Sequence, residues 1–349
     1  MLASVLLLAC AGPGSSDGSF EDTASAPGPS YDIPEFPEGV STLAGSDTMA
    51  SSDGLGDAAA FHEPKTIALR ADGVLIVVGG DGQVREVDQS GAVQTLSFGG
   101  ATLTDAGGLA IDADGAIYVS DPQQHCIVRI ADGMGDVFAG TCGTSGMAEG
   151  ASALFTRPRG LTFDGQGNLL VADSENMRIR SISPDGVVST VAGIDSFSGP
   201  TEGSISSATL YYPIDIAVHE GGDIYFSGLD NCIRRIQGEQ VENMAGLCQN
   251  YSSEGSDDGA PEDARFYAPF DITFADTDTL IISDSFNDRI RIYSIEEQIV
   301  STLTGSSAGY LDGSLDEALF EIPRAVTVDR QGNLFVADSV NHRVRVVVP

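Results

Sequence analysis

Residues 325–347 read AVTVDRQGNLFVADSVNHRVRVV, and residues 160–182 read GLTFDGQGNLLVADSENMRIRSI. The two stretches are copies of one unit, and fainter copies occur elsewhere. Counted from the Pro that opens each unit, or its equivalent, the copies begin at Pro64, Ala106, Pro158, Pro213, Pro269 and Pro323. A recurring unit of this size indicates a repeat architecture, which decides the fold.

Each unit contains four short apolar runs. In the copy that opens at Pro158, residues 161–163 alternate, a Gly-rich turn follows, and residues 169–171 are densely apolar. Residues 178–180 alternate basic and aliphatic side chains, and residues 188–193 form the fourth run. Alternation bounded by turn residues predicts strands. Four antiparallel strands per unit form a propeller blade, so six copies predict an all-β, six-bladed β-propeller.

The last copy lacks its fourth run, because the sequence given ends at Pro349. A sequence of the missing kind precedes the first copy, where residues 40–45 (VSTLAG) closely match the fourth run at residues 188–193 (VSTVAG). We expect this N-terminal strand to join the C-terminal blade as its outer strand and close the ring, which leaves no long open edge. The propeller is therefore expected at 40–349, with blades near 64–99, 106–142, 158–193, 213–248, 269–305, and 323–349 plus 40–45.

The repeat text resembles the NHL-repeat family over about residues 40–349. Residues 333–338 (NLFVAD) and 341–345 (NHRVR) fit that family's pattern closely, and residues 168–180 fit with Met177 in place of His. The resemblance implies the propeller fold. It says little about function, because the family holds sensor, adhesion and scaffold modules and a few enzymes.

The charge of the chain narrows the class of partner. Lys and Arg number 17 against 51 Asp and Glu, which gives a net charge of −34. Nucleic acids and anionic membrane surfaces are disfavoured as direct partners. We expect a monomer that binds a protein or a small molecule, and that touches a membrane only through a lipid anchor.

The first residues indicate export. Residues 1–10 form a short apolar run that ends in Cys10, and they resemble a bacterial lipoprotein signal with Leu7, Ala9 and a lipidated Cys10 in its box. No Lys or Arg precedes the run, which departs from that pattern. Residues 11–39 have the Gly, Ser and Pro content of a disordered tether. The expected location is the bacterial cell envelope, lipid-anchored at the outer membrane, periplasm or cell surface, or otherwise the secreted fraction.

Four further cysteines support an oxidising compartment. Cys126 begins the third strand of one unit and Cys142 follows its fourth strand, and Cys232 and Cys248 occupy the same places two units later. Since these strand ends lie side by side in an antiparallel pair, we expect two disulfides, Cys126–Cys142 and Cys232–Cys248.

An acidic face is the expected recognition surface. The strand ends and linkers on one side of the ring carry Asp121, Asp173, Asp284, Asp338, Asp257, Asp258 and Asp312. Calcium is a candidate cofactor, because it prefers carboxylate oxygens, although no EF-hand loop occurs. The alternative is that the repeated Asp residues bind amides of their own turns or pair with Arg178, Arg289 or Arg343.

An enzyme is the competing class. Some propellers that resemble this fold are metal-dependent lyases or lactonases, and His62, His125 and His342 become neighbours once the ring closes. Such a site at the channel mouth would need these histidines as metal ligands. His342 also belongs to the repeat's own turn. No catalytic motif identifies a nucleophile, so a binding or scaffold module is the leading hypothesis.

Overall fold

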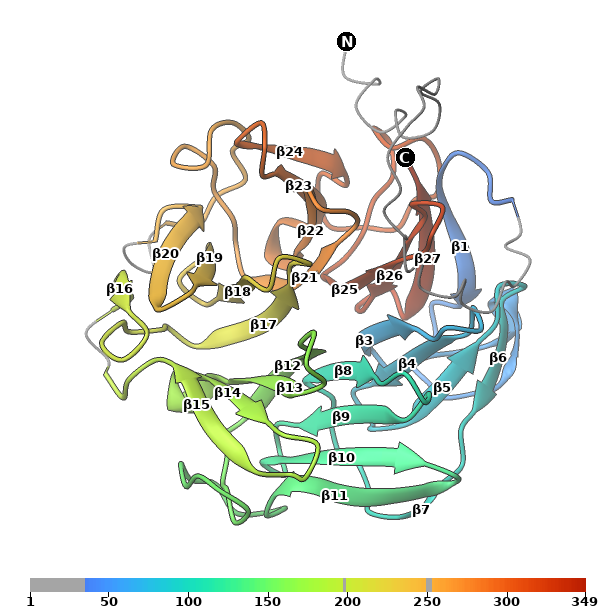
Figure 1. Cartoon of the computed structure of the whole chain (residues 1–349). Coiled ribbons are helices and arrows are strands. Elements are labelled where there is room, and N and C mark those ends of the chain that lie inside the picture. Colours follow the sequence, from blue (N-terminus) through green and yellow to red (C-terminus); the bar gives the residue numbers. More distant parts are fainter. Residues whose placement is uncertain (1–34, 197–198, 249–252) are drawn as a thin grey trace, which may run out of the picture.

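The computed structural model describes residues 35–196, 199–248 and 253–349. Over these residues the chain forms six β-sheets in a ring, with the first strand of each sheet nearest the centre (Figure 1). This confirms the predicted six-bladed β-propeller. No helix in the described ranges is long and apolar enough to cross a membrane.

The blades follow one another along the chain, each with its strands ordered from the centre outward. Blades 1 to 3 consist of β3 (Pro64–Leu69), β4 (Leu75–Gly79), β5 (Val84–Val87) and β6 (Ala92–Thr95); β8 (Gly108–Ile111), β9 (Ile117–Asp121), β10 (Cys126–Ala131) and β11 (Met134–Gly140); and β12 (Pro158–Phe163), β13 (Leu169–Asp173), β14 (Arg178–Ile182) and β15 (Val188–Ala192). Blades 4 to 6 consist of β17 (Pro213–Val218), β18 (Ile224–Gly228), β19 (Cys232–Gln237) and β20 (Gln240–Ala245); β21 (Pro269–Phe274), β22 (Thr279–Asp284), β23 (Arg289–Ser294) and β24 (Ile299–Thr304); and β25 (Pro323–Val328), β26 (Leu334–Asp338), β27 (Arg343–Val348) and β1 (Gly39–Gly45).

Three blades have a fifth strand that the repeat text does not predict. The linkers add a two-residue strand to the outer edge of blades 1, 2 and 4, as β2 (Gly54–Leu55), β7 (Gly99–Gly100) and β16 (Gly203–Ser204). Short 3-10 turns occur at η1 (Gly56–Ala58), η2 (Ser174–Asn176) and η3 (Ser285–Asn287). The added strands cover part of an edge that would otherwise be unpaired.

The ring closes as the displaced fourth strand predicts. β1 runs antiparallel to β27, with Gly39 opposite Val348 and Gly45 opposite Arg343. Figure 1 shows this strand, in blue, completing the red C-terminal blade. The last blade therefore combines strands from both ends of the described chain.

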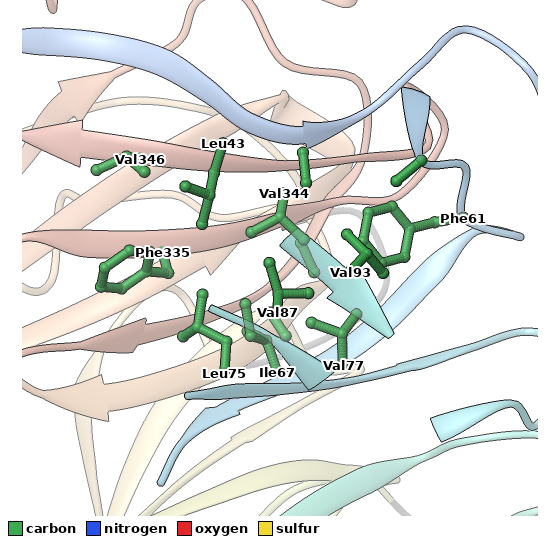
Figure 2. Packing of buried hydrophobic residues seen from close by; sticks show 14 residues of the cluster. Leu43, Phe61, Ile67, Leu75, Val77, Val87, Val93, Phe335, Val344 and Val346 are labelled. Carbon is green, nitrogen blue, oxygen red and sulfur yellow. The ribbon is translucent and has the colours of Figure 1, made fainter. Parts of the chain in front are cut away.

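The hydrophobic core is divided into six wedges, one between each pair of neighbouring blades. Figure 2 shows the wedge at the closure, where Leu43, Phe335 and Val344 face Ile67, Leu75 and Val77. Since every sheet is covered on both faces, the second strands are buried along nearly their whole length, and β13 is apolar up to its final Asp173.

A buried Phe and a buried Arg recur together in most blades. Phe61, Phe155, Phe266 and Phe320 come from the linkers and are buried, as expected of residues that fill the space between blades. The guanidinium of a third-strand Arg stacks on each ring at 5.0–5.7 Å; these are Arg85, Arg180, Arg291 and Arg345. A cation over an aromatic face is attracted by the ring, and the stack fixes the linker to its blade.

Candidate functional site

The four aspartates that end the second strands are structural. Asp121, Asp173, Asp284 and Asp338 have no exposed surface. Asp173 accepts the backbone N–H of Thr156 at 2.8 Å and the guanidinium of Arg180 at 2.9 Å. Burial raises the pKa of Asp338 to about 6, against the opposing effect of Arg345. The structure thus removes these four carboxylates from the expected acidic face, because each one holds the linker that enters its own blade.

In three of these blades an arginine pairs with the Asp, and it differs from the expected one. Arg180, Arg291 and Arg345 make these ion pairs, whereas Arg178 and Arg343 donate to the carbonyls of Asn176 and Asn341. Arg180 lies two residues beyond Arg178 on the same face of the strand. Its side chain is completely buried, as is the carboxylate of Asp173 with which it pairs.

Three of the predicted acidic residues lie on exposed linkers. Asp258 pairs with Arg291 at 2.6 Å, and Asp312 pairs with Arg345 at 2.6 Å. Asp257 is exposed and directly precedes Asp258 in the chain. Two of these three carboxylates are therefore partly neutralised by arginines of the repeat.

The histidines connect blades. His125 Nδ1 accepts the backbone N–H of Arg157 at 3.1 Å, and His342 Nδ1 accepts that of Glu63 at 3.4 Å. Asn231 and Asp288 use side-chain oxygens in the same way, so this turn position ties each such blade to the next. In the described part of the chain, no three His, Cys, Asp or Glu side chains are arranged to hold a metal ion. The predicted set of His62, His125 and His342 is thus not assembled there.

A β-bulge opens the first strand of five blades. The strand pairing shifts just after the Pro of β3, β12, β17, β21 and β25. A bulge re-aims the side chain of its extra residue. The residues that directly follow the Pro are Lys65, Arg159, Ile214, Phe270 and Arg324.

These bulged residues bring basic side chains together at one mouth of the channel. Arg159 belongs to blade 3 and Arg324 to blade 6, which are opposite in the ring, yet their charges influence each other. Lys65, from blade 1, pairs with Asp105 at 2.5 Å, and Asp105 also acts on both arginines. The charges of these side chains therefore act on one another across the channel. We call Lys65, Arg159 and Arg324 the basic mouth.

The two arginines of the basic mouth lack partners. Within residues 35–196, 199–248 and 253–349, neither guanidinium forms an ion pair or a hydrogen bond, and the closest aromatic contact is that of Arg324 with Phe270 at 4.8 Å. Burial, and then the charges of Arg324 and Arg157, lower the pKa of Arg159 to about 10. Burial lowers the pKa of Arg324 as well. Unpaired charge in a recess is unfavourable, so this arrangement is suited to receive an anion.

Below the mouth lies a cavity of about 280 Å³ lined by all six first strands. Two carboxyl groups, from Asp215 and Asp271, face it. Asp215 accepts the N–H of Ile272 at 2.9 Å, Asp271 accepts that of Val326 at 2.9 Å, and the two side chains hydrogen-bond each other. Burial raises the pKa of Asp215 to about 7, and burial together with the charge of Asp215 raises that of Asp271. The pair therefore shares a proton and joins blades 4, 5 and 6.

Neither the basic mouth nor the carboxyl pair was predicted from the sequence. Their residues occupy the first two positions after the Pro that opens the unit, and these positions differ between the copies. The signal that identifies them is a charged residue at the start of an otherwise apolar strand.

Both predicted disulfides are present. Cys126 and Cys142 have their Cα atoms 5.1 Å apart, and Cys232 and Cys248 have theirs 5.4 Å apart. Each bridge joins the start of the third strand to the chain just after the fourth, in blades 2 and 4. The finding agrees with an oxidising compartment.

Comparison with known proteins supports the repeat family. The NHL repeat model matches residues 155–180 and 320–347. The human "NHL repeat-containing protein 2" is 28% identical over 57% of this chain, and "Teneurin-1" of Caenorhabditis elegans is 26% identical over 90% of it. The matched regions are 32% and 14% of those proteins, so the chain corresponds to a minor part of each relative.

A similar solved structure is an auxiliary nutrient binding protein from Bacteroides ovatus. It is 19% identical, covers 89% of this chain and 76% of its own, and has a TM-score of 0.70. At this identity the likeness shows a shared fold, which is compatible with a binding or scaffold module.

Proposed function

We propose that this chain, an NHL-repeat β-propeller, is an exported binding module that holds a small anionic ligand at the mouth of its central channel. The observation that carries the proposal is that Arg159 and Arg324, on opposite blades, act on each other through their charges while neither has an ion-pair or hydrogen-bond partner among the described residues. A protein of net charge −34 has few basic residues, and three of its 17 gather here.

An anion between these guanidiniums has two favourable effects. It relieves the repulsion between the two arginines, and it offers oxygens to planar donors that bind carboxylate or phosphate groups in a bidentate manner. Lys65 stands at the edge of the site, already paired with Asp105. The ligand is small, because the cavity beneath the mouth is about 280 Å³.

The acidic linkers are the weaker place for recognition. Asp258 and Asp312 already pair with Arg291 and Arg345, so part of their negative charge is neutralised within the blade. Cation binding, calcium included, would depend on the remaining exposed carboxylates such as Asp257.

Export and lipid anchoring are part of the proposal. The two disulfides support an oxidising compartment, and the lipoprotein-like segment with Cys10 falls in residues 1–34, outside those that the structure describes. The test is fractionation of cells that carry Cys10→Ala. Release of the protein from the membrane fraction is the expected result, and unchanged retention contradicts the anchor.

The binding proposal is tested by thermal unfolding with inorganic phosphate, because a ligand that binds only the folded state raises Tm. Phosphate is expected to raise the Tm of the native protein and of the control Arg330→Gln, whose side chain is exposed. It should leave Arg159→Gln and Arg324→Gln unchanged. Equal shifts in all four proteins contradict the assigned site.

Metal analysis distinguishes the lyase or lactonase alternative from the binding proposal. It requires stoichiometric metal in the purified protein, lost together with activity on substitution of His62 or His125. The structure gives it no specific support, since His125 and His342 are engaged between blades.

A further inference from the structure

The basic mouth continues into an aromatic surface on blade 5. Phe270 is the bulged residue of β21, and the guanidinium of Arg324 lies over its ring at 4.8 Å. Phe286, on the turn η3, meets Phe270 edge-on with ring centroids 5.5 Å apart, and Tyr267 meets Phe286 at 5.1 Å. We call Tyr267, Phe270 and Phe286 the aromatic shelf.

The shelf is open to solvent. Phe286 is 44% exposed and Tyr267 is 39% exposed. Three of the other copies place Gln123, Glu175 and the smaller Val340 at the turn position of Phe286, and none of these is aromatic. The repeat therefore does not require an aromatic residue there, and the exposed rings leave apolar surface in contact with water.

Charge and apolar surface are divided between opposite arcs of the mouth. Blades 6, 1 and 3 supply Arg324, Lys65 and Arg159, whereas blades 4 and 5 supply Ile214 and Phe270 at the same bulge position. A ligand held by the arginines thus has an apolar wall on one side. Aromatic faces and edges pack well against a flat ring.

We infer that the ligand class is an aryl or similarly flat apolar anion, with its carboxylate or phosphate between Arg159 and Arg324 and its ring on the aromatic shelf. This inference rests on the proposed function. It adds a selectivity that an anion site alone does not have, because the shelf discriminates among anions by the group attached to the charge.

The test compares inorganic phosphate with phenyl phosphate by isothermal titration of the full chain. Phenyl phosphate is expected to bind about tenfold more tightly than phosphate, since one aromatic contact contributes on that order. Phe286→Ala should abolish the preference and leave phosphate binding unchanged. The control is Ile299→Ala, another exposed apolar residue of blade 5, on its outer strand β24.

The outcomes separate the two claims. Equal affinity for the two probes overturns the aromatic inference and leaves the anion site standing. A preference that survives Phe286→Ala also overturns it, because the shelf is then not the cause. Absence of binding by both probes overturns the proposed function and the inference with it.

Discussion

Replacing Asp215 by Asn should remove a loss of stability that the native protein suffers as the pH rises. The folded state keeps a proton on the pair of Asp215 and Asp271, and it raises the pKa of Asp215 from its ordinary 3.8 to about 7. The unfolded chain releases that proton at lower pH. The contribution is therefore fully present below about pH 4 and is lost as the pH rises through about 7.

The size of this loss in stability follows from the pH interval between the pKa of Asp215 in the unfolded chain and its pKa in the folded protein. Between pH 5 and pH 7 the unfolded carboxyl is ionised while the folded one is still protonated, and each pH unit is worth about 1.4 kcal/mol. The native protein should thus lose about 3 kcal/mol across this interval from Asp215 alone. The amide that Asp215→Asn introduces retains an acceptor for the N–H of Ile272 and offers an amide hydrogen to Asp271 in place of the shared proton.

The assay is urea unfolding at pH 5 and pH 8, with disulfides intact. The general repulsion of a chain with net charge −34 also grows with pH, so the control is Asp114→Asn, an exposed turn residue. The free energy of unfolding of Asp215→Asn, relative to this control, should rise by about 3 kcal/mol from pH 5 to pH 8. An equal pH dependence in the two variants would refute the shared proton.

Three further substitutions test the parts of the blade. Phe155→Ala should lower the free energy of unfolding, measured in urea, by about 3–5 kcal/mol, because it removes a fully buried ring from under Arg180. A loss below about 1 kcal/mol would show that the ring does not fill the space between the blades. Asp173→Ala should lower the free energy of unfolding by about 3–5 kcal/mol, since Arg180 is left buried and unpaired. Asp258→Ala, whose carboxylate is half exposed, should lower it by about 1 kcal/mol or less. Similar losses in the two variants would contradict the difference in burial. The double change of Cys232→Ser and Cys248→Ser should cost about 3 kcal/mol, and an unchanged Tm would indicate that the bridge does not form.

Much of the fold could be predicted from the sequence, because the same pattern of strands and turns recurs in several copies. Asp173 and Asn176, at the end of β13 and in its turn, read as a turn signal. In the structure Asp173 accepts the N–H of Thr156 in the linker, and Asn176 donates to the carbonyl of Gly146 and to Asp173. The strand at Val40 is identified by comparing its letters with those of other fourth strands. The disulfides follow from strand ends that an antiparallel pair must bring together.

The proposed anion site was not predicted from the sequence, and the reason is physical. The repeated polar residues are those that every blade needs, so Asp173 and His342 serve the scaffold and are not free for a ligand. Residues that face the channel are under no such constraint and differ between copies. Arg159 and Arg324 are far apart in sequence, and their charges act on each other only because the closed ring places blades 3 and 6 across the same channel; nothing in either copy alone indicates this.

The central claim is that Arg159 and Arg324 bind an anion at the mouth of the channel. The most direct measurement is a crystal structure of the protein soaked in tungstate, a phosphate-like anion whose metal is located by anomalous scattering. The account predicts an anomalous peak between the two guanidiniums, absent from crystals of Arg324→Gln. Well-diffracting native crystals with tungstate bound elsewhere and none at this mouth would contradict it.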